Sequence, residues 1–162
     1  MSKDWKEKFR LEDLQRLRGF RLMDDDFMSK CFEENIECTE LVLQIVLGRD
    51  DLKVEKVAIQ HHLKNLQGRS IIFDIYATDH AGKRYNVEIQ RADCGAGAKR
   101  ARYHSSLIDA NVTEPGEKLE NLVETYVIFI TECDVLGKGK PIYHIDRVIK
   151  ETGENFGDEA HI

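Results

Sequence analysis

The segments Phe73-Asp74-Ile75-Tyr76 and Asn86-Val87-Glu88-Ile89-Gln90 decide the fold of this chain. Both are rich in β-branched and aromatic residues, which favour strands, and a short polar stretch at positions 79–83 separates them. The spacing predicts one β-hairpin whose loop is centred on Ala81, with Asp74 paired to Glu88 and Ile72 paired to Gln90. Because side chains alternate faces along a strand, Asn86, Glu88 and Gln90 should share one face.

This hairpin brings two carboxylates, Asp74 and Glu88, to neighbouring positions of one sheet. Like charges opposite each other destabilise a sheet, and a buried charge without a partner is costly. A divalent cation between the two acids would reverse this effect, so the pair is typical of half a metal site. The alternative is two solvated acids on an outer face. The apolar runs around both acids favour central strands covered on both sides, and therefore favour the metal site.

The composition is that of an ordinary globular domain. With 162 residues, 41% of them hydrophobic and 33% charged, the chain is long enough for one domain with a sizeable core. It has no apolar run of membrane-spanning length and no apolar signal segment at its start, which predicts a cytoplasmic protein. The four cysteines are scattered, which argues against zinc ligation and for free thiols: Cys31, Cys38, Cys94 and Cys133.

The charge is acidic overall but unevenly distributed. The formal net charge is −6, which argues against a non-specific binder of polyanions. Basic residues nevertheless outnumber acidic ones over positions 1–23, and Lys99-Arg100-Ala101-Arg102 is a compact basic cluster. On spacing alone this cluster favours a solvated helix face over a phosphate contact. Since acids at a metal site add to the negative charge, the net charge does not exclude a nucleic-acid substrate.

The order of predicted elements indicates an α/β fold. Asp24-Asp25-Asp26 is typical of a helix start and Gly48 of a helix end. Between them we expect one long helix, or two with a break near positions 37–39 and Thr39 as the second cap. The remaining predictions are strands at 54–63, 70–78, 84–91 and 125–131, a helix at 98–110, a candidate last strand at 142–148 and a polar tail at 149–162. A three-strand meander, a crossover helix and a further strand give a mixed sheet with helices on both faces.

These residues resemble the PD-(D/E)xK nuclease superfamily, and within it the PD-(D/E)xK nuclease family transposases, which are related to recombination-promoting nucleases. The signature of the superfamily is an acid on the second strand and an acid-x-Lys on the third. Asp74 and Glu88-Ile89-Gln90 match it, with the Glu-x-Gln variant common in this branch. The flanking segments that add to the resemblance, over residues 18–148, are Gly68-Arg69-Ser70, Tyr85-Asn86-Val87, Arg102-Tyr103 and Tyr126-Val127-Ile128-Phe129-Ile130.

The resemblance implies a restriction-endonuclease-like three-layer α/β/α core, ordered helix-strand-strand-strand-helix-strand. Together with the charge pattern, it predicts a basic N-terminal arm or helix at 1–23, a nuclease-like domain at 24–148 and a polar tail at 149–162, with a helical region usually following in relatives. It also implies Mg²⁺ or Mn²⁺ as cofactor and DNA as partner, allows a homodimer, and implies no membrane and no nucleotide cofactor. Hard oxygen ligands suit these cations.

The resemblance further assigns a role to each candidate site residue. Asp74, Glu88 and the Ile89 carbonyl are metal ligands, and Asp25 assists through a bound water or a second metal, with Asp24 and Asp26 as alternates. Gln90 stands where a lysine is usual, and its uncharged amide can only orient water. The DNA phosphate contacts would be Lys99, Arg100 and Arg102. Tyr103 is expected in the core, and the histidines His61, His62 and His104 fit no metal-ligand spacing.

Three functions remain open on the sequence. The first is a metal-dependent DNA endonuclease associated with transposition or recombination. The second is a catalytically weak or inactive module of the same fold that binds DNA or a partner protein. The third is an accessory module that needs a further C-terminal region to act. The intact Asp74, Glu88 and Gln90 favour the enzyme, whereas the acidic charge and the missing lysine favour the binding module.

Overall fold

The computed structural model describes residues 13, 15, 16, 18, 19, 21, 23–33, 35–91 and 96–162, with the side chains of Asp25 and Asp26 excepted. The predicted basic arm at 1–23 and Cys94 therefore lie wholly or largely outside the described residues. Among the helices that are described, none is long and apolar enough to cross a membrane.

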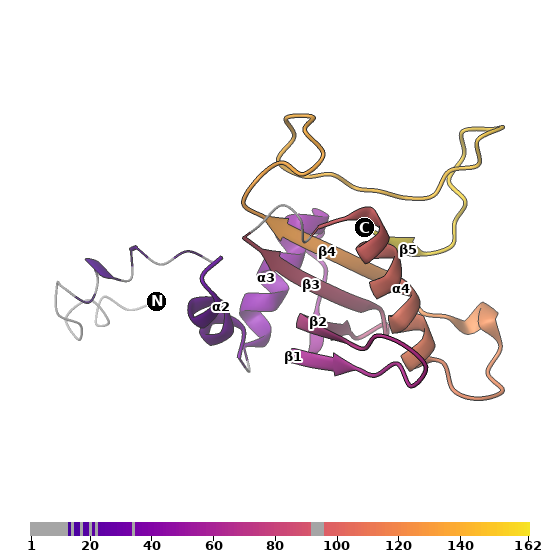
Figure 1. Ribbon diagram of the computed structural model, residues 1–162, viewed down its shortest axis with the longest axis horizontal. Helices are drawn as coiled ribbons and strands as arrows, with labels where there is room; N and C mark the ends of the chain where they lie inside the picture. The colour runs from indigo at the N-terminus through magenta and orange to yellow at the C-terminus, as the bar shows by residue number, and fades with distance from the viewer. Residues whose placement is uncertain are drawn as a thin grey trace.

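A mixed five-stranded sheet forms the centre of the molecule, in the order β1-β2-β3-β4-β5. The β1–β2 and β2–β3 pairs are antiparallel, whereas β3–β4 and β4–β5 are parallel. A parallel pair needs a crossover connection, and the helix between β3 and β4 supplies it (Figure 1). The strands are β1 (Val54–Leu63), β2 (Ile71–Asp79), β3 (Arg84–Gln90), β4 (Thr125–Thr131) and β5 (Ala160–His161).

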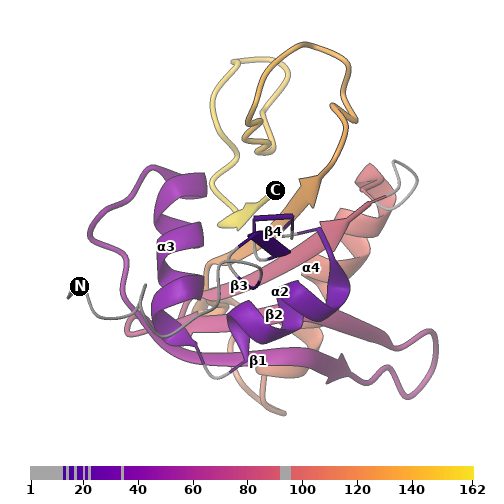
Figure 2. The same cartoon turned by 90° about the vertical axis from the view of Figure 1, so that its left-hand side faces the viewer.

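Helices cover both faces of this sheet and make a three-layer α/β/α arrangement. Figure 2 shows α2 (Asp25–Phe32) and α3 (Ile36–Leu47) in front of the sheet and α4 (Ala98–Val112) behind it. A short 3₁₀ turn, η3 (Leu119–Asn121), lies in the connection from α4 to β4. The predicted restriction-endonuclease-like α/β fold is thus confirmed.

Two apolar cores hold the layers together, one on each side of the sheet. On the first side, Phe32 of α2 and Leu43 of α3 pack on Ile75 and Val87. On the second side, Leu107 and Ile108 of α4 pack on Phe73 and Val127. Strand β3 is therefore buried on both faces, and Asn86 and Glu88 are fully buried polar residues on it.

The hairpin turn sets the register between β2 and β3. The Asp79 carboxylate accepts from the backbone N–H groups of Ala81 and Lys83, both at 2.9 Å, and from the Tyr85 hydroxyl at 2.8 Å. Gly82 has a φ of 84°, a left-handed conformation that glycine adopts without strain. The pairs run from Thr78↔Arg84 to Ile75↔Val87, so the loop is centred on Ala81 as predicted.

Of the two alternatives for this region, one long helix or two, the structure has two helices, but the position of the break and the cap are not as expected. The helix ends at Phe32 and restarts at Ile36, earlier than residues 37–39. Asn35, not Thr39, caps α3, because its side chain accepts from the backbone N–H of Cys38 at 3.0 Å. Thr39 is buried and donates its hydroxyl to the Asn35 carbonyl, and Gly48 ends α3 in a left-handed conformation, as predicted.

The prediction of a last strand at 142–148 is wrong. The fifth strand is Ala160–His161, which lies beyond the predicted domain boundary at residue 148 and pairs with Thr125 and Tyr126. Ile145 instead exchanges two backbone hydrogen bonds with Ile162, at 2.8 and 3.1 Å. Its hydrogen-bonding groups are thus used by the end of the chain instead of the edge of β4.

Candidate active site

Strands β2 and β3 separate at the two acids. Their ladder ends with the pair Ile75↔Val87, so Asp74 and Glu88 stand at the next position. The ladder therefore contains neither of the predicted pairs, Asp74 with Glu88 and Ile72 with Gln90.

Asp74 occupies the opening between these two strands. Its Oδ2 accepts from the backbone N–H of Ile89 at 2.8 Å, where a regular ladder would place a backbone carbonyl. The N–H and C=O of one residue point to the same side of a strand, so the Ile89 carbonyl also faces β2. Asp74 thus lies at the opening between the strands, beside the backbone of Ile89 and one residue along β3 from Glu88.

The regular alternation of β2 is interrupted at Asp74. Strict alternation puts Phe73 and Tyr76 on opposite faces, yet their ring centroids lie 5.7 Å apart on the α4 side. In the neighbouring strand, Gln60 has a φ of 48°, and the β1–β2 pairs skip from Ile59↔Ile75 to His61↔Phe73 at this point. A side chain other than glycine rarely adopts such a φ, and strained residues of this kind cluster at functional sites.

Glu88 belongs to a closed ring of hydrogen bonds with Asn86, Arg100 and His104. Its Oε2 accepts from Arg100 Nη2 at 2.7 Å and its Oε1 accepts from Asn86 Nδ2 at 2.9 Å. His104 closes the ring, with Nε2 3.2 Å from Arg100 Nε and Nδ1 3.1 Å from Asn86 Oδ1. As predicted, Asn86 and Glu88 share a face, and this face meets α4.

The position of Glu88 makes its carboxylate costly to ionise. Its side chain is only 1% exposed, and burial raises the pKa of Glu88 above its ordinary value. The hydrogen bond from Asn86 and the charge of Arg100 act in the opposite direction. The negative charge of Asp74 raises the pKa further.

His104 is held as a neutral ring. Burial, assisted by the positive charges of Arg100 and Arg69, lowers the pKa of His104 to about 4. Arginine only donates, so His104 Nε2 accepts from it and Nδ1 carries the proton that Asn86 Oδ1 accepts. The sequence pattern had indicated no role for His104 or Asn86. The spacing of Arg100 and His104, one helical turn apart, was the signal that could have joined them.

The other predicted site residues lie at different distances from the acids. Gln90 Oε1 accepts from Arg100 Nη1 at 3.3 Å, so Gln90 adjoins the ring. Lys99 and Arg102 are exposed on the other side of α4. The backbone of Asp25 begins α2, and its neighbour Asp24 forms an ion pair with Arg91, the residue after Gln90. The side chain of Asp25 lies outside the described part of the structure.

The sequence was compared with models of known protein families. A family model described as PD-(D/E)XK nuclease family transposase matches residues 32–162, which include both acids and all five strands. The chain belongs to this family. No curated protein and no solved structure matches it. The predicted resemblance is therefore confirmed, and the match extends past residue 148 through β5.

The donor set of this PD-(D/E)XK family member fits a hard divalent cation. Carboxylate and carbonyl oxygens suit magnesium and manganese, whereas zinc sites use histidine and cysteine. Within the described residues, no group of three or more His, Cys, Asp or Glu side chains could hold a metal. A site here would accordingly use Asp74 and Glu88 with a backbone oxygen.

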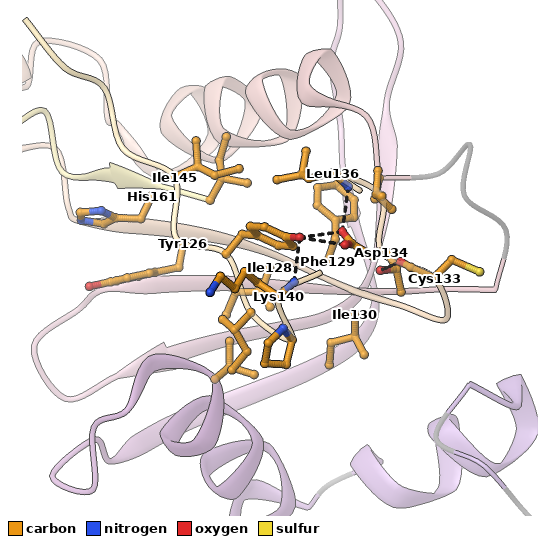
Figure 3. Close-up of a pocket in the computed structure, with 18 of the residues that line it drawn as sticks. Tyr126, Ile128, Phe129, Ile130, Cys133, Asp134, Leu136, Lys140, Ile145 and His161 are labelled. Carbon is orange, nitrogen blue, oxygen red and sulfur yellow. Dashed lines mark hydrogen bonds between the residues drawn. The ribbon is translucent and has the colours of Figure 1, made fainter. Parts of the chain in front are cut away.

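A second feature of this family member is an apolar pocket beside β4. Its volume is about 460 Å³, and it lies between β4 and the C-terminal segment (Figure 3). Asp134 accepts from the Tyr143 hydroxyl at its rim, at 2.8 Å. Phe129 lines the pocket and also lies 5.7 Å from the Arg100 guanidinium, so this ring separates the pocket from the acids.

Proposed function

We propose that the chain is a metal-dependent DNA endonuclease associated with transposition or recombination. One observation carries the proposal: Asp74 and Glu88 stand at the position where β2 and β3 separate, and the charge of Asp74 raises the pKa of Glu88. Two neighbouring acids favour a bound cation, and membership of a nuclease family supports this chemistry.

Asp74, Glu88 and the Ile89 carbonyl would hold Mg²⁺ or Mn²⁺. A bound divalent cation stabilises negative charge on a phosphodiester and lowers the pKa of its water. Hydrolysis then forms a bond from the water oxygen to phosphorus, breaks one phosphorus–oxygen ester bond and leaves a proton on the departing oxygen. Asp25 is the proposed accessory acid, supported by the start of α2 beside Arg91 at the end of β3.

The remaining residues would bind and orient the substrate. Gln90 can hold a water molecule through its amide but cannot take its proton. Lys99 and Arg102, exposed on α4, would contact DNA phosphates away from the acids and fix the register of the duplex. Arg100 differs from both because it already contacts Glu88.

That same contact favours the alternative function, a weak or inactive module that binds DNA or a partner protein. The Arg100–Glu88 ion pair at 2.7 Å neutralises Glu88 from within the chain. In an inactive module this pair would be permanent and the acids would serve only the fold.

Cleavage of supercoiled plasmid DNA in Mg²⁺ or Mn²⁺ tests the proposal. We expect the wild type to nick the plasmid, and Asp74→Asn and Glu88→Gln to lose about 100-fold or more in rate, because metal catalysis supplies several kcal/mol. Asp25→Asn tests the accessory acid in the same assay and should lower the rate.

Glu55→Gln is the matched control, since Glu55 is an exposed glutamate of β1 paired with Lys56. It should cleave as the wild type does. A wild type that binds Mn²⁺ calorimetrically but leaves DNA intact supports the binding module. Cleavage that survives in both Asp74→Asn and Glu88→Gln refutes the assignment of the site.

A further inference from the structure

The third position of the signature, Gln90, brings no positive charge to the acids. A glutamine amide is neutral and cannot replace a cation beside a phosphate. The guanidinium of Arg100 nevertheless lies at this position, because Nη1 donates to Gln90 Oε1 at 3.3 Å while Nη2 donates to Glu88 Oε2 at 2.7 Å. A positive charge therefore stands between the second acid and Gln90, but it comes from α4.

We propose that Arg100 supplies the cationic group that Gln90 lacks, and that His104 and Asn86 position it. The inference rests on the proposed nuclease function. In it, the guanidinium donates to a non-bridging oxygen of the scissile phosphate and neutralises negative charge as the water oxygen adds. Arg100 thus becomes a catalytic residue, and His104 and Asn86 act only through it.

The surroundings of Arg100 suit this role. Its side chain is 38% exposed whereas Glu88 is 1% exposed, so Arg100 is the member of the ring that a phosphate in solvent can reach. Its guanidinium also lies 5.7 Å from the centroid of Phe129, close enough for a cation–π contact.

The direction of the hydrogen bonds explains how Arg100 is held. Arg100 donates to Nε2 of a neutral His104, whose Nδ1 proton goes to Asn86 Oδ1, and Asn86 Nδ2 donates to Glu88 Oε1. In each of these bonds a donor meets an acceptor. The series begins at Arg100, which also donates to Glu88 Oε2, and it ends at Glu88 Oε1. The ring fixes the guanidinium relative to the carboxylate that would hold the metal.

Moving the charge provides the decisive experiment. Arg100→Gln should lower kcat for plasmid nicking by about 100-fold. Adding Gln90→Lys to Arg100→Gln should restore at least about tenfold, because the new lysine returns a positive charge to the same place. Arg49→Gln is the matched control: Arg49 has a similar exposure, 35%, pairs with Asp51 and should leave kcat unchanged.

Titration with Mn²⁺ in the absence of DNA gives a second readout. Arg100→Gln should bind Mn²⁺ about tenfold more tightly than the wild type, because the variant lacks a like charge next to Glu88. Arg49→Gln should bind as the wild type does. A merely structural role for Arg100 predicts weaker binding, and that result would overturn the inference.

His104 needs a test that separates positioning from stability. His104→Gln can still accept from Arg100 and donate to Asn86, so it should retain kcat within about fivefold, whereas His104→Phe should lose kcat about as Arg100→Gln does with little change in KM. Melting curves identify any variant that fails to fold. If His104→Phe does not fold, Mn²⁺ is titrated into His104→Gln alone, which should bind as the wild type does. Equal kcat in both His104 variants contradicts the positioning role.

The outcomes distinguish this inference from the function on which it rests. A wild type without cleavage refutes the nuclease proposal and the role of Arg100 with it. A wild type that cleaves, with Asp74→Asn inactive and Arg100→Gln fully active, refutes the role of Arg100 alone.

Discussion

At the scale of single residues, a proton and the proposed metal ion would compete for the oxygens of Glu88. The folded protein raises the pKa of Glu88 above its ordinary value of 4.5, mainly through burial. Below the raised pKa the protonated form is favoured, and above it the carboxylate that a metal needs. We predict that Mn²⁺ affinity rises with pH up to the raised pKa and then levels off, with a proton released on binding below that pKa.

Calorimetric titration in two buffers of different ionisation enthalpy measures this proton. The apparent binding heats should differ between buffers in the acidic range and converge as the pH rises. Glu88→Gln is the control, because it has no proton to release at this position. Identical heats in both buffers over the whole range would contradict a role for Glu88 as a metal ligand.

Sequence alone could supply some of these residues and not others. Asp74 and Glu88 follow from strand parity and hairpin length, which are local properties. His104 and Asn86 act through contacts between α4 and β3, which exist only after the crossover helix has packed on the sheet. The spacing of one helical turn could have joined His104 to Arg100, but it gives no sign of Asn86 on β3.

At the scale of elements, the β2–β3 turn fixes which residues face each other. Asp79 is 6% exposed and accepts three hydrogen bonds within the turn. We predict that Asp79→Ala lowers the free energy of unfolding by about 2–3 kcal/mol, because it leaves the buried Tyr85 hydroxyl and two backbone N–H groups without their acceptor.

Urea unfolding measures this loss, and Asp79→Asn provides the comparison. The amide oxygen of asparagine can still accept from Ala81 and Lys83, so this variant should lose about 1 kcal/mol or less. Equal losses in the two variants would show that the turn does not depend on these bonds.

Helix boundaries show why local patterns were less reliable than strand register. Positions 27–47 keep a nearly continuous helical spacing, so the sequence does not locate the break. The structure puts it at 33–35, where Asn35 caps α3 and lets Phe32 and Leu43 both reach the same core. Tertiary packing, and not the cap alone, decides between Asn35 and Thr39.

At the scale of the whole molecule, metal binding should stabilise the fold. A ligand that binds only the folded state adds about 2.7 kcal/mol at 100 times its Kd. For a domain of this size that corresponds to a rise in Tm of about 5–10 °C. We predict such a rise for the wild type in Mn²⁺, measured by differential scanning calorimetry, and none for the Asp74→Asn/Glu88→Gln double variant. A rise of equal size in the double variant would place the metal elsewhere.

The C-terminal part of the molecule was the hardest to predict. The apolar residues of 142–148 suggested a strand, but the edge of β4 is joined by Ala160 and His161. His161 accounts for this choice: its ring stacks on Tyr126 at 4.7 Å and its two nitrogens contact Asp146 at 2.6 Å and Glu124 at 3.1 Å. A polar segment of two residues has no periodicity from which such pairing could be predicted.

The site described above has a consequence for the order of folding. Six polar residues around Glu88 come from one stretch of the chain between positions 74 and 104: Asp74, Asn86, Glu88, Gln90, Arg100 and His104. Closing short loops costs little chain entropy, and local contacts go with rapid folding. The acids can therefore come together before the chain end returns to β4, and amide exchange at Ile89 should be suppressed earlier in refolding than exchange at Ile162.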